Sequence, residues 1–153
     1  MKIFKYFIVI IALFSLTSCF FETGEKKKKE VVVPDKITYL FVTQPHCPSC
    51  DKLEKTMILE KPKKLLSRYF NIKKLYYGEK LPAGLTPPNG TPTVYFLGAE
   101  DEVLVEPMVG EKSEKDLMEF LTDSLYEFKN IYHVDLEKKY RENNETNNST
   151  IIN

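Results

Sequence analysis

The sequence predicts one α/β domain with a central mixed β-sheet and flanking helices in three layers, and the order of its apolar segments is the reason. Residues 36–42 form a nearly continuous run of aromatic and β-branched side chains, which is typical of a buried central strand. A helical segment separates this run from a second strand expected at residues 71–77. A crossover of that kind makes the two strands parallel, whereas a hairpin expected at residues 93–105 adds antiparallel partners.

Two helical segments are expected between the first two strands. Apolar residues at helical spacing follow Cys47, so the first helix is expected to begin at this cysteine. Pro62 is expected to break or kink the element, because proline lacks a backbone N–H and its ring clashes with the preceding turn. A second helical segment is therefore expected at residues 63–70.

Proline and glycine divide the second half of the chain. Residues 81–90 contain so many of both that this segment is expected to be a loop. Residues 93–97 and 103–105 are short apolar strands around a polar turn, and they predict the hairpin. Ser113 is expected to cap a final amphipathic helix, with Asp116 three residues further on.

The N-terminal segment has the features of a secretory signal. Lys2 and Lys5 precede the apolar run 7–16, and Leu16-Thr17-Ser18 lies directly before Cys19. The run is shorter than the roughly 20 apolar residues that a spanning helix needs. This end resembles bacterial lipoprotein precursors, and the resemblance implies cleavage before Cys19 and acylation of its side chain. An uncleaved membrane helix is the alternative, and both interpretations place the domain outside the cytoplasm.

The lipoprotein resemblance implies a signal peptide at residues 1–18 and a lipidated cysteine that begins a flexible tether at 19–35. Composition predicts the folded domain at 36–129 and a polar, partly disordered C-terminal extension at 130–153. Lys and Arg number 22, against 22 Asp and Glu, so no basic field suggests a nucleic-acid partner. We expect a monomer in the cell envelope or periplasm, attached to the membrane through Cys19.

The chain has three cysteines, and their spacing is informative. Cys19 belongs to the lipidation motif, so the domain has one candidate disulfide, between Cys47 and Cys50. A bridge that closes so small a loop removes little entropy from the unfolded chain. The pair is therefore poorly explained as a structural staple, and a redox-active disulfide that needs no further cofactor is the better interpretation.

Four features occur in the order expected of one known fold. Cys47-Pro48-Ser49-Cys50 stands at the junction of strand and helix, and Thr91-Pro92 opens the later strand with Pro92 45 residues after Cys47. The hairpin follows, and then Gly110 with the last helix. This set resembles thioredoxin-fold thiol-disulfide oxidoreductases. The resemblance implies a thioredoxin fold and a cis-proline at Pro92 that faces the cysteine pair.

The sequence departs from thioredoxins proper at three places. They usually have tryptophan before the first cysteine and Gly-Pro within the pair, where this chain has His46 and Pro48-Ser49. They also carry a buried acid on the strand at the position of Phe41. Pro-Ser and the threonine before the cis-proline are closer to glutaredoxins and to some periplasmic Dsb-type proteins, so the resemblance does not fix a subfamily.

Thiol-disulfide exchange needs a thiolate, and a free cysteine with a pKa near 8.5 is mostly protonated at neutral pH. A helix N-terminus stabilises the anion, so we expect Cys47 to attack and Cys50 to resolve the mixed disulfide. His46 either assists as an imidazolium or is a solvent-facing loop residue. The residues expected to contact substrate surround the pair: His46, Pro48, Ser49, Thr91 and Pro92.

The function expected is exchange with protein thiols and disulfides, with a slight preference for a reductase recharged by a membrane electron donor; a membrane electron acceptor fits the opposite direction. One alternative is a copper metallochaperone, because two thiolates can hold Cu(I). Another is a non-catalytic thioredoxin-fold binding protein. A zinc site is disfavoured because a closed site wants about four ligands, and no resident metal is expected.

Overall fold

The computed structural model describes residues 31–149, with side chains as far as residue 143. The predicted signal peptide, the lipidation site Cys19 and most of the tether therefore lie outside the described residues. The elements in chain order are β1 (Ile37–Thr43), α2 (Pro48–Met57), α3 (Glu60–Tyr69), β2 (Phe70–Tyr76), β3 (Thr93–Leu97), η1 (Ala99–Asp101), β4 (Met108–Val109), α4 (Glu114–Tyr132) and α5 (Leu136–Ser149).

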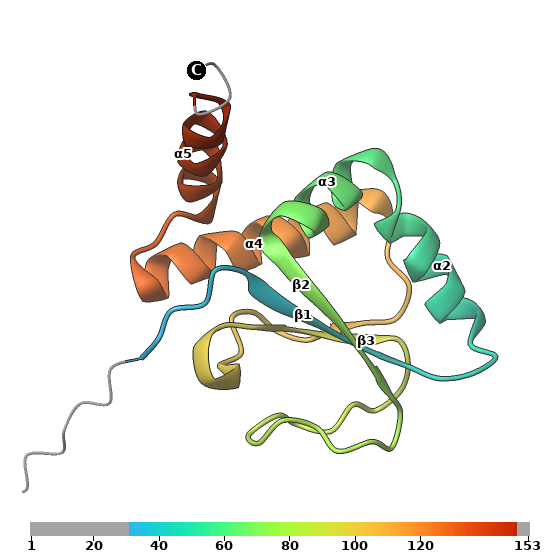
Figure 1. Cartoon of the computed structure of the whole chain (residues 1–153). Coiled ribbons are helices and arrows are strands. Elements are labelled where there is room, and N and C mark those ends of the chain that lie inside the picture. Colours follow the sequence, from blue (N-terminus) through green and yellow to red (C-terminus); the bar gives the residue numbers. More distant parts are fainter. Residues whose placement is uncertain (1–30, 150–153) are drawn as a thin grey trace, which may run out of the picture. The chain divides into compact units, whose positions relative to one another are not determined.

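The sheet is mixed, as predicted, with the strand order β2-β1-β3-β4 (Figure 1). β1 pairs in parallel with β2 and antiparallel with β3, and β3 pairs antiparallel with β4. The apolar run identified in the sequence is the central strand β1, with five of its seven residues fully or almost fully buried in a row at its C-terminal end. The C-terminal ends of β1 and β2 therefore lie at the same end of the sheet.

The two faces of the sheet are covered differently, and this differs from the three layers expected. Ile37, Tyr39 and Phe41 of β1 belong to the main core, together with buried residues of α2, α3 and α4. On the opposite face Leu40 and Val42 join a smaller cluster, which is covered by side chains of the loop between β2 and β3. Proline and glycine prevent a helix in that loop, so the described helices that pack on the sheet share one face.

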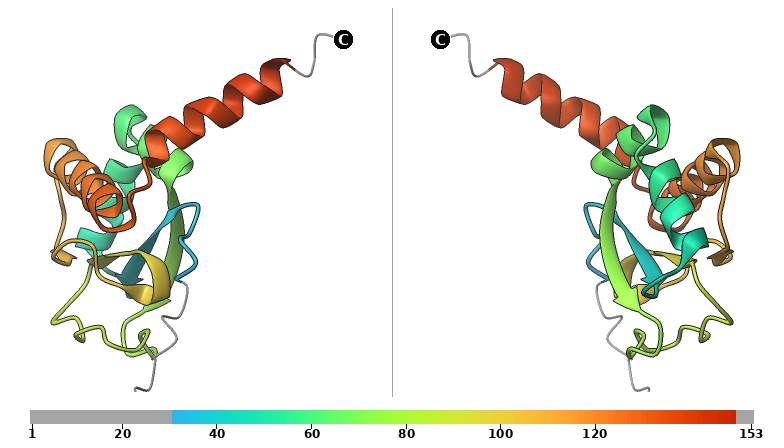
Figure 2. Two further views of the ribbon diagram at one scale, coloured as in Figure 1. Left: turned by 90° about the vertical axis from the view of Figure 1, so that its left-hand side faces the viewer. Right: turned by 90° about the vertical axis from the view of Figure 1, so that its right-hand side faces the viewer.

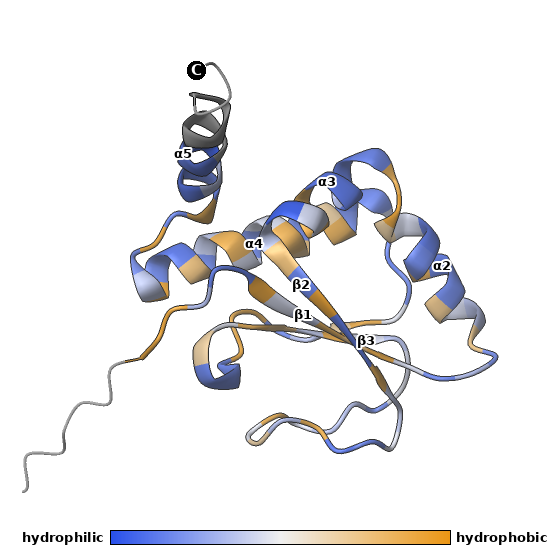
Figure 3. Cartoon of the chain, viewed as in Figure 1, coloured by the Kyte–Doolittle hydropathy of each residue, from blue (hydrophilic) through white to orange (hydrophobic). Residues whose placement is uncertain are grey.

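The hydropathy of the chain follows this division. Figure 3 shows hydrophobic segments along β1 and on the stripes of α3 and α4, while the described part of α5 is mostly hydrophilic. Within residues 31–149 no helix combines the length and the apolar character that a membrane crossing requires.

The break between α2 and α3 occurs earlier than predicted. α2 ends at Met57 and α3 begins at Glu60, so Pro62 lies inside the first turn of α3. A proline is tolerated there because the first N–H groups of a helix have no acceptor in any case. The prediction placed the start of α3 at residue 63, where the chain is already helical.

The return strand of the hairpin was predicted at the wrong place. Val103 forms only a single bridge to Leu97, and the regular partner of β3 is β4, where Met108 pairs with Val94. The ladder is interrupted at Pro107, which has no N–H to donate. Sequence apolarity alone favoured residues 103–105, because the position of the interruption depends on pairing.

The folded unit extends beyond the boundary expected at residue 129. α4 continues to Tyr132 and ends at His133, which adopts a left-handed conformation. Leu136 is 5% exposed and belongs to the main core, and Tyr140 packs edge-on against Tyr69. Figure 2 shows α5 projecting from this attachment point.

Candidate active site

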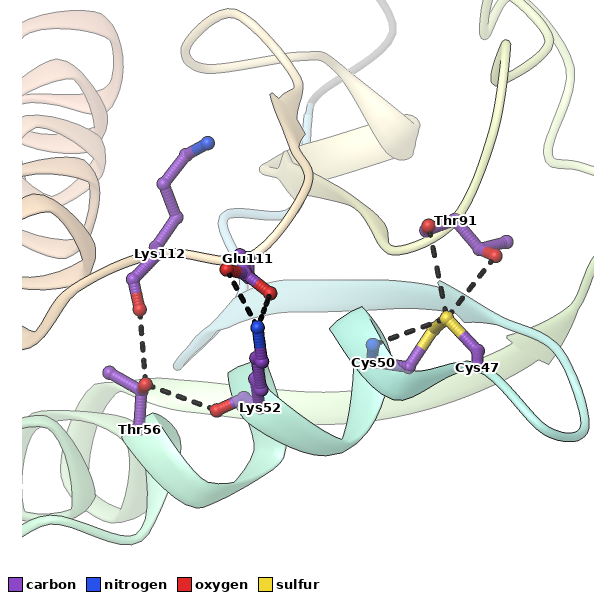
Figure 4. Close-up of polar contacts among 7 residues, drawn as sticks. All are labelled: Cys47, Cys50, Lys52, Thr56, Thr91, Glu111 and Lys112. Atoms are coloured by element: carbon purple, nitrogen blue, oxygen red, sulfur yellow. Dashed lines mark hydrogen bonds and ion pairs between the residues drawn. A yellow bond between two sulfur atoms is a disulfide. The ribbon is translucent and has the colours of Figure 1, made fainter.

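The two cysteines of the domain form a disulfide at the start of α2 (Figure 4). Cys47 is the N-cap residue of this helix, Pro48 follows in its first turn, and Cys50 lies within that turn. The short loop after the buried strand β1 delivers Cys47 to this position. Cys47 is 6% exposed and Cys50 is 2% exposed, so Cys47 is the more accessible of the two.

The sulfur of Cys47 receives a backbone hydrogen bond from the helix that it caps. The N–H of Cys50 donates to Cys47 Sγ over 3.2 Å, and the side chain therefore acts as the helix cap. This N–H is one of the donors that a helix N-terminus leaves without a backbone acceptor. In the reduced protein the same donor and the positive end of the helix dipole would stabilise a thiolate on Cys47.

Thr91 lies directly against the same sulfur, although it is 44 residues away in the sequence. Its hydroxyl oxygen is 3.6 Å from Cys47 Sγ and its carbonyl oxygen is 3.8 Å away. The Thr91–Pro92 peptide bond is cis. Thr91 is half-buried and Pro92 is buried. Figure 4 shows Thr91 approaching the disulfide from a segment other than the one that carries the cysteines. The structure thus brings together the two sequence features on which the site was predicted.

The threonine is held in place by hydrogen bonds on both sides. The Gly110 N–H donates to the Pro92 carbonyl over 2.8 Å, and the Thr93 hydroxyl donates to the Gly90 carbonyl over 2.8 Å. Gly110 has a φ of 80°, a conformation that favours glycine. The sequence places Gly110 between the hairpin and the last helix, and this hydrogen bond shows that it also anchors the proline.

A second connection joins α2 to the segment that follows Gly110. Lys52 Nζ lies 3.0 Å from a carboxylate oxygen of Glu111, and the Thr56 hydroxyl donates to the Lys112 carbonyl over 3.0 Å (Figure 4). An exposed ion pair contributes only about 0–1 kcal/mol. The hydrogen bond adds to it, so the contact fixes the orientation of the helix that carries the cysteines. No sequence signal distinguished these residues from other surface charges.

The remaining predicted site residues lie around the disulfide with less contact. His46 is exposed, has a φ of 55°, and its side chain takes part in no hydrogen bond or ion pair within residues 31–149. Pro48 is exposed and Ser49 is half-buried at the start of α2. Phe41 is completely buried and lies beneath the ammonium group of Lys74, 5.7 Å from its ring centre. An aromatic ring therefore fills the position where thioredoxins carry an acid.

The described residues offer few candidate metal ligands near the two cysteines. Across residues 31–149 no group of three or more His, Cys, Asp or Glu side chains is arranged to hold a metal ion. His133 ends α4, the longest helix within residues 31–149, in a left-handed conformation. The disulfide and its threonine contact are thus the chemical centre that the described residues display.

The crossover from β1 through helices to a parallel strand, the antiparallel strands that follow, and the final helix define an α/β thioredoxin-like fold that carries a CxxC disulfide. A solved structure similar to this chain is the periplasmic thioredoxin SoxS from Paracoccus pantotrophus in its reduced form. It is 21% identical, the match covers 60% of this chain and 98% of that chain, and the TM-score is 0.49. No protein-family model and no curated protein matches the sequence.

Proposed function

We propose that this protein is a thiol-disulfide oxidoreductase that exchanges the Cys47–Cys50 disulfide with protein thiols and disulfides. The observation that carries the proposal is the environment of Cys47 Sγ: a backbone N–H at a helix N-terminus on one side and Thr91 on the other. A structural disulfide needs neither feature. A nucleophilic thiolate needs the backbone N–H, which stabilises its charge. A docked substrate chain benefits from the Thr91 segment, because an open backbone segment there can pair with it.

In the reducing direction the Cys47 thiolate attacks one sulfur of a substrate disulfide. A bond forms between Cys47 Sγ and that sulfur, the substrate bond breaks, and the other substrate sulfur leaves and takes a proton. Cys50 then loses its proton and attacks Cys47 Sγ. This step restores the Cys47–Cys50 disulfide and releases the second substrate thiol. Two electrons have passed to the substrate, and a dithiol donor must return two electrons for the next cycle.

The reductase direction and the membrane location are parts of the same proposal: the N-terminal sequence supports the membrane location, and a tether suits the reductase direction. The lipoprotein-like N-terminus would tether the domain outside the cytoplasm through Cys19. A tethered domain is well placed to receive electrons from a membrane protein and to pass them to secreted thiols. Replacement Cys19→Ser tests the lipid attachment: the protein should lose the mass of its acyl chains, and an unchanged mass would contradict acylation at this residue.

The exchange activity is tested with the full chain and two matched variants. Wild-type protein should reduce the disulfides of insulin when dithiothreitol supplies electrons, Cys47→Ser should abolish the reaction, and Cys50→Ser should accumulate a mixed disulfide with the substrate. Equal trapping by both variants would contradict the assigned roles. Equilibration with glutathione then fixes the direction: a potential near −270 mV supports a reductase, and one near −120 mV indicates an oxidant.

A further inference from the structure

An apolar cavity lies beside the candidate active site, on the face of the sheet that no described helix covers. Its volume is about 390 Å³, and its floor is formed by Val42 of β1 and Leu75 of β2. The loop between β2 and β3 forms the wall, with Leu85 and Pro88. Figure 1 shows this loop running below the sheet from the end of β2 to the start of β3.

The chemistry of the lining selects an apolar occupant. Tyr76 and Tyr77 at the rim are 53% and 51% exposed, so about half of the surface of each of these aromatic residues is open to solvent. The acid in the lining, Glu79, is already engaged, because its carboxylate accepts the Tyr76 N–H over 2.6 Å. Leucine, proline and tyrosine side chains dominate the rest. Sites of this composition take aliphatic or aromatic groups.

The cavity lies near the site of sulfur chemistry, to which its lining is connected by the chain and by a backbone hydrogen bond. Pro88 in its wall is three residues before Thr91, which contacts Cys47 Sγ. Tyr77 donates its N–H to the Thr43 carbonyl at the end of β1, and the segment of Thr91 enters the strand on the other side of β1. Two strand spacings, about 10 Å, therefore separate the end of β2, at the rim, from the start of β3, which Thr91 precedes by two residues.

From this arrangement we propose that the cavity binds an apolar side chain of the same polypeptide whose cysteine reacts at Cys47. The inference rests on the proposed exchange function and adds a substrate preference to it. An extended chain advances about 3.3 Å per residue, so a span of about 10 Å places the apolar side chain about three residues from the reacting cysteine. A leucine or phenylalanine at that spacing reaches the cavity, and one adjacent to the cysteine does not.

Binding is measured without any redox step by a fluorescent variant. The chain contains no tryptophan, so Tyr77→Trp places a single reporter at the rim. Peptides with serine in place of cysteine are added to the full-length variant. A peptide with leucine three residues from the serine should shift the emission to the blue at concentrations about tenfold below those required by a peptide of the same composition with leucine adjacent to the serine. Equal responses to the two peptides would overturn the inference.

Exchange rates provide the second measurement. Each peptide, now with cysteine, is supplied as its mixed disulfide with glutathione, and kcat/KM is compared between the two leucine positions. Wild type should favour the distant leucine about tenfold, Tyr77→Ser should remove most of this preference, and Tyr126→Ser should retain it. Tyr126 is a suitable control because it is 63% exposed on α4 and lies outside the cavity lining.

The two measurements separate the two proposals. Failure of wild type to react with either mixed disulfide, or with glutathione disulfide, would overturn the exchange function. Reaction with both peptides at equal rates, together with equal fluorescence responses, would overturn the substrate preference and leave the exchange function standing. A preference that persists in Tyr77→Ser would place the apolar contact elsewhere and likewise overturn the assignment of this cavity.

Discussion

The buried hydroxyl of Tyr39 allows the cost of an unpaired polar group to be measured with one substitution. The side chain is completely buried in the middle of β1, and its hydroxyl is without a hydrogen-bond partner. Burial also raises the pKa of this phenol above its usual value near 10. The ring itself is well packed, with edge-on contacts to Phe96 at 5.4 Å and Phe70 at 6.5 Å between ring centres.

Replacement Tyr39→Phe should therefore stabilise the protein. It keeps the ring contacts and removes a polar group whose burial without a partner costs about 1–3 kcal/mol in proteins. The expected gain in the free energy of unfolding is about 1–2 kcal/mol, since some void remains where the oxygen was. Urea unfolding of the full chain measures this change, as a higher midpoint with an unchanged slope.

A second tyrosine provides the control with the opposite sign. Tyr95 is also in the sheet, but its hydroxyl donates to the Thr86 carbonyl over 2.7 Å. The same chemical change, Tyr95→Phe, should cost about 0.5–1.5 kcal/mol, because a hydrogen bond is lost and the carbonyl is left without this donor. Destabilisation by Tyr39→Phe comparable to that by Tyr95→Phe would refute the reasoning, since it would mean that the buried hydroxyl has a partner.

Three further predictions follow from single contacts. Replacement Thr91→Val removes a hydroxyl near Cys47 Sγ; because the thiolate loses a hydrogen-bond donor, alkylation of the reduced protein by iodoacetamide at pH 7 should slow roughly threefold. Replacement Gly98→Ala would push a Cβ into the Tyr132 hydroxyl; it should lower the free energy of unfolding by about 1–3 kcal/mol. Asp135 has its pKa lowered, chiefly by a hydrogen bond from a lysine of α4. Its contribution to stability is therefore present above about pH 4 and lost as the pH falls below that value, and Asp135→Asn should flatten this acid decline in unfolding measurements.

Each of the three predictions has an outcome that would contradict it. An unchanged alkylation rate in Thr91→Val at every pH would show that the hydroxyl does not interact with the thiolate. The penalty of Gly98→Ala should shrink in a Tyr132→Ala background, and an equal penalty in both backgrounds would exclude the steric explanation. For Asp135→Asn, an acid decline as steep as in wild type would assign the decline to other carboxylates.

The contact between Tyr132 and the turn after β3 shows how the two ends of the domain are connected. The Tyr132 hydroxyl accepts the Ala99 N–H over 2.8 Å and donates to a carboxylate oxygen of Glu102 over 2.7 Å. Burial and the hydrogen bond to Glu102 raise the pKa of Tyr132 to about 12. The last turn of α4 is thus attached to the hairpin, which explains why the helix continues past the boundary expected from composition.

Several site features could be read from the sequence because they are local. Cys47 was placed at a helix start by the apolar strand before it and the helical spacing after it, and Ser113 was recognised as a cap by its residue type. The proline and glycine content of residues 81–90 correctly predicted a loop. Features of this kind depend on backbone chemistry within a few residues, which the sequence displays directly.

Features that depend on strand pairing or side-chain packing could not be predicted from the sequence. Three such features join residues distant in the chain. They are the hydrogen bond from Gly110 to the proline loop, the ion pair of Lys52 with Glu111 and the packing of Leu136 in the core. The return strand was misplaced for the same reason, because a ladder continues only where both strands supply donors and acceptors in register.

The sequence by itself determined the α/β order of elements and the pair Cys47–Cys50 at a helix start, since both follow from local propensity and spacing. The resemblance to thioredoxin-fold proteins added Thr91-Pro92 as the expected partner segment. Only the tertiary structure decided that Thr91 lies against Cys47 Sγ, that helices cover one face of the sheet, and that a loop leaves an apolar cavity on the other. These outcomes depend on how segments distant in sequence fill space against one another, and the energy of that packing is not a property of any one segment.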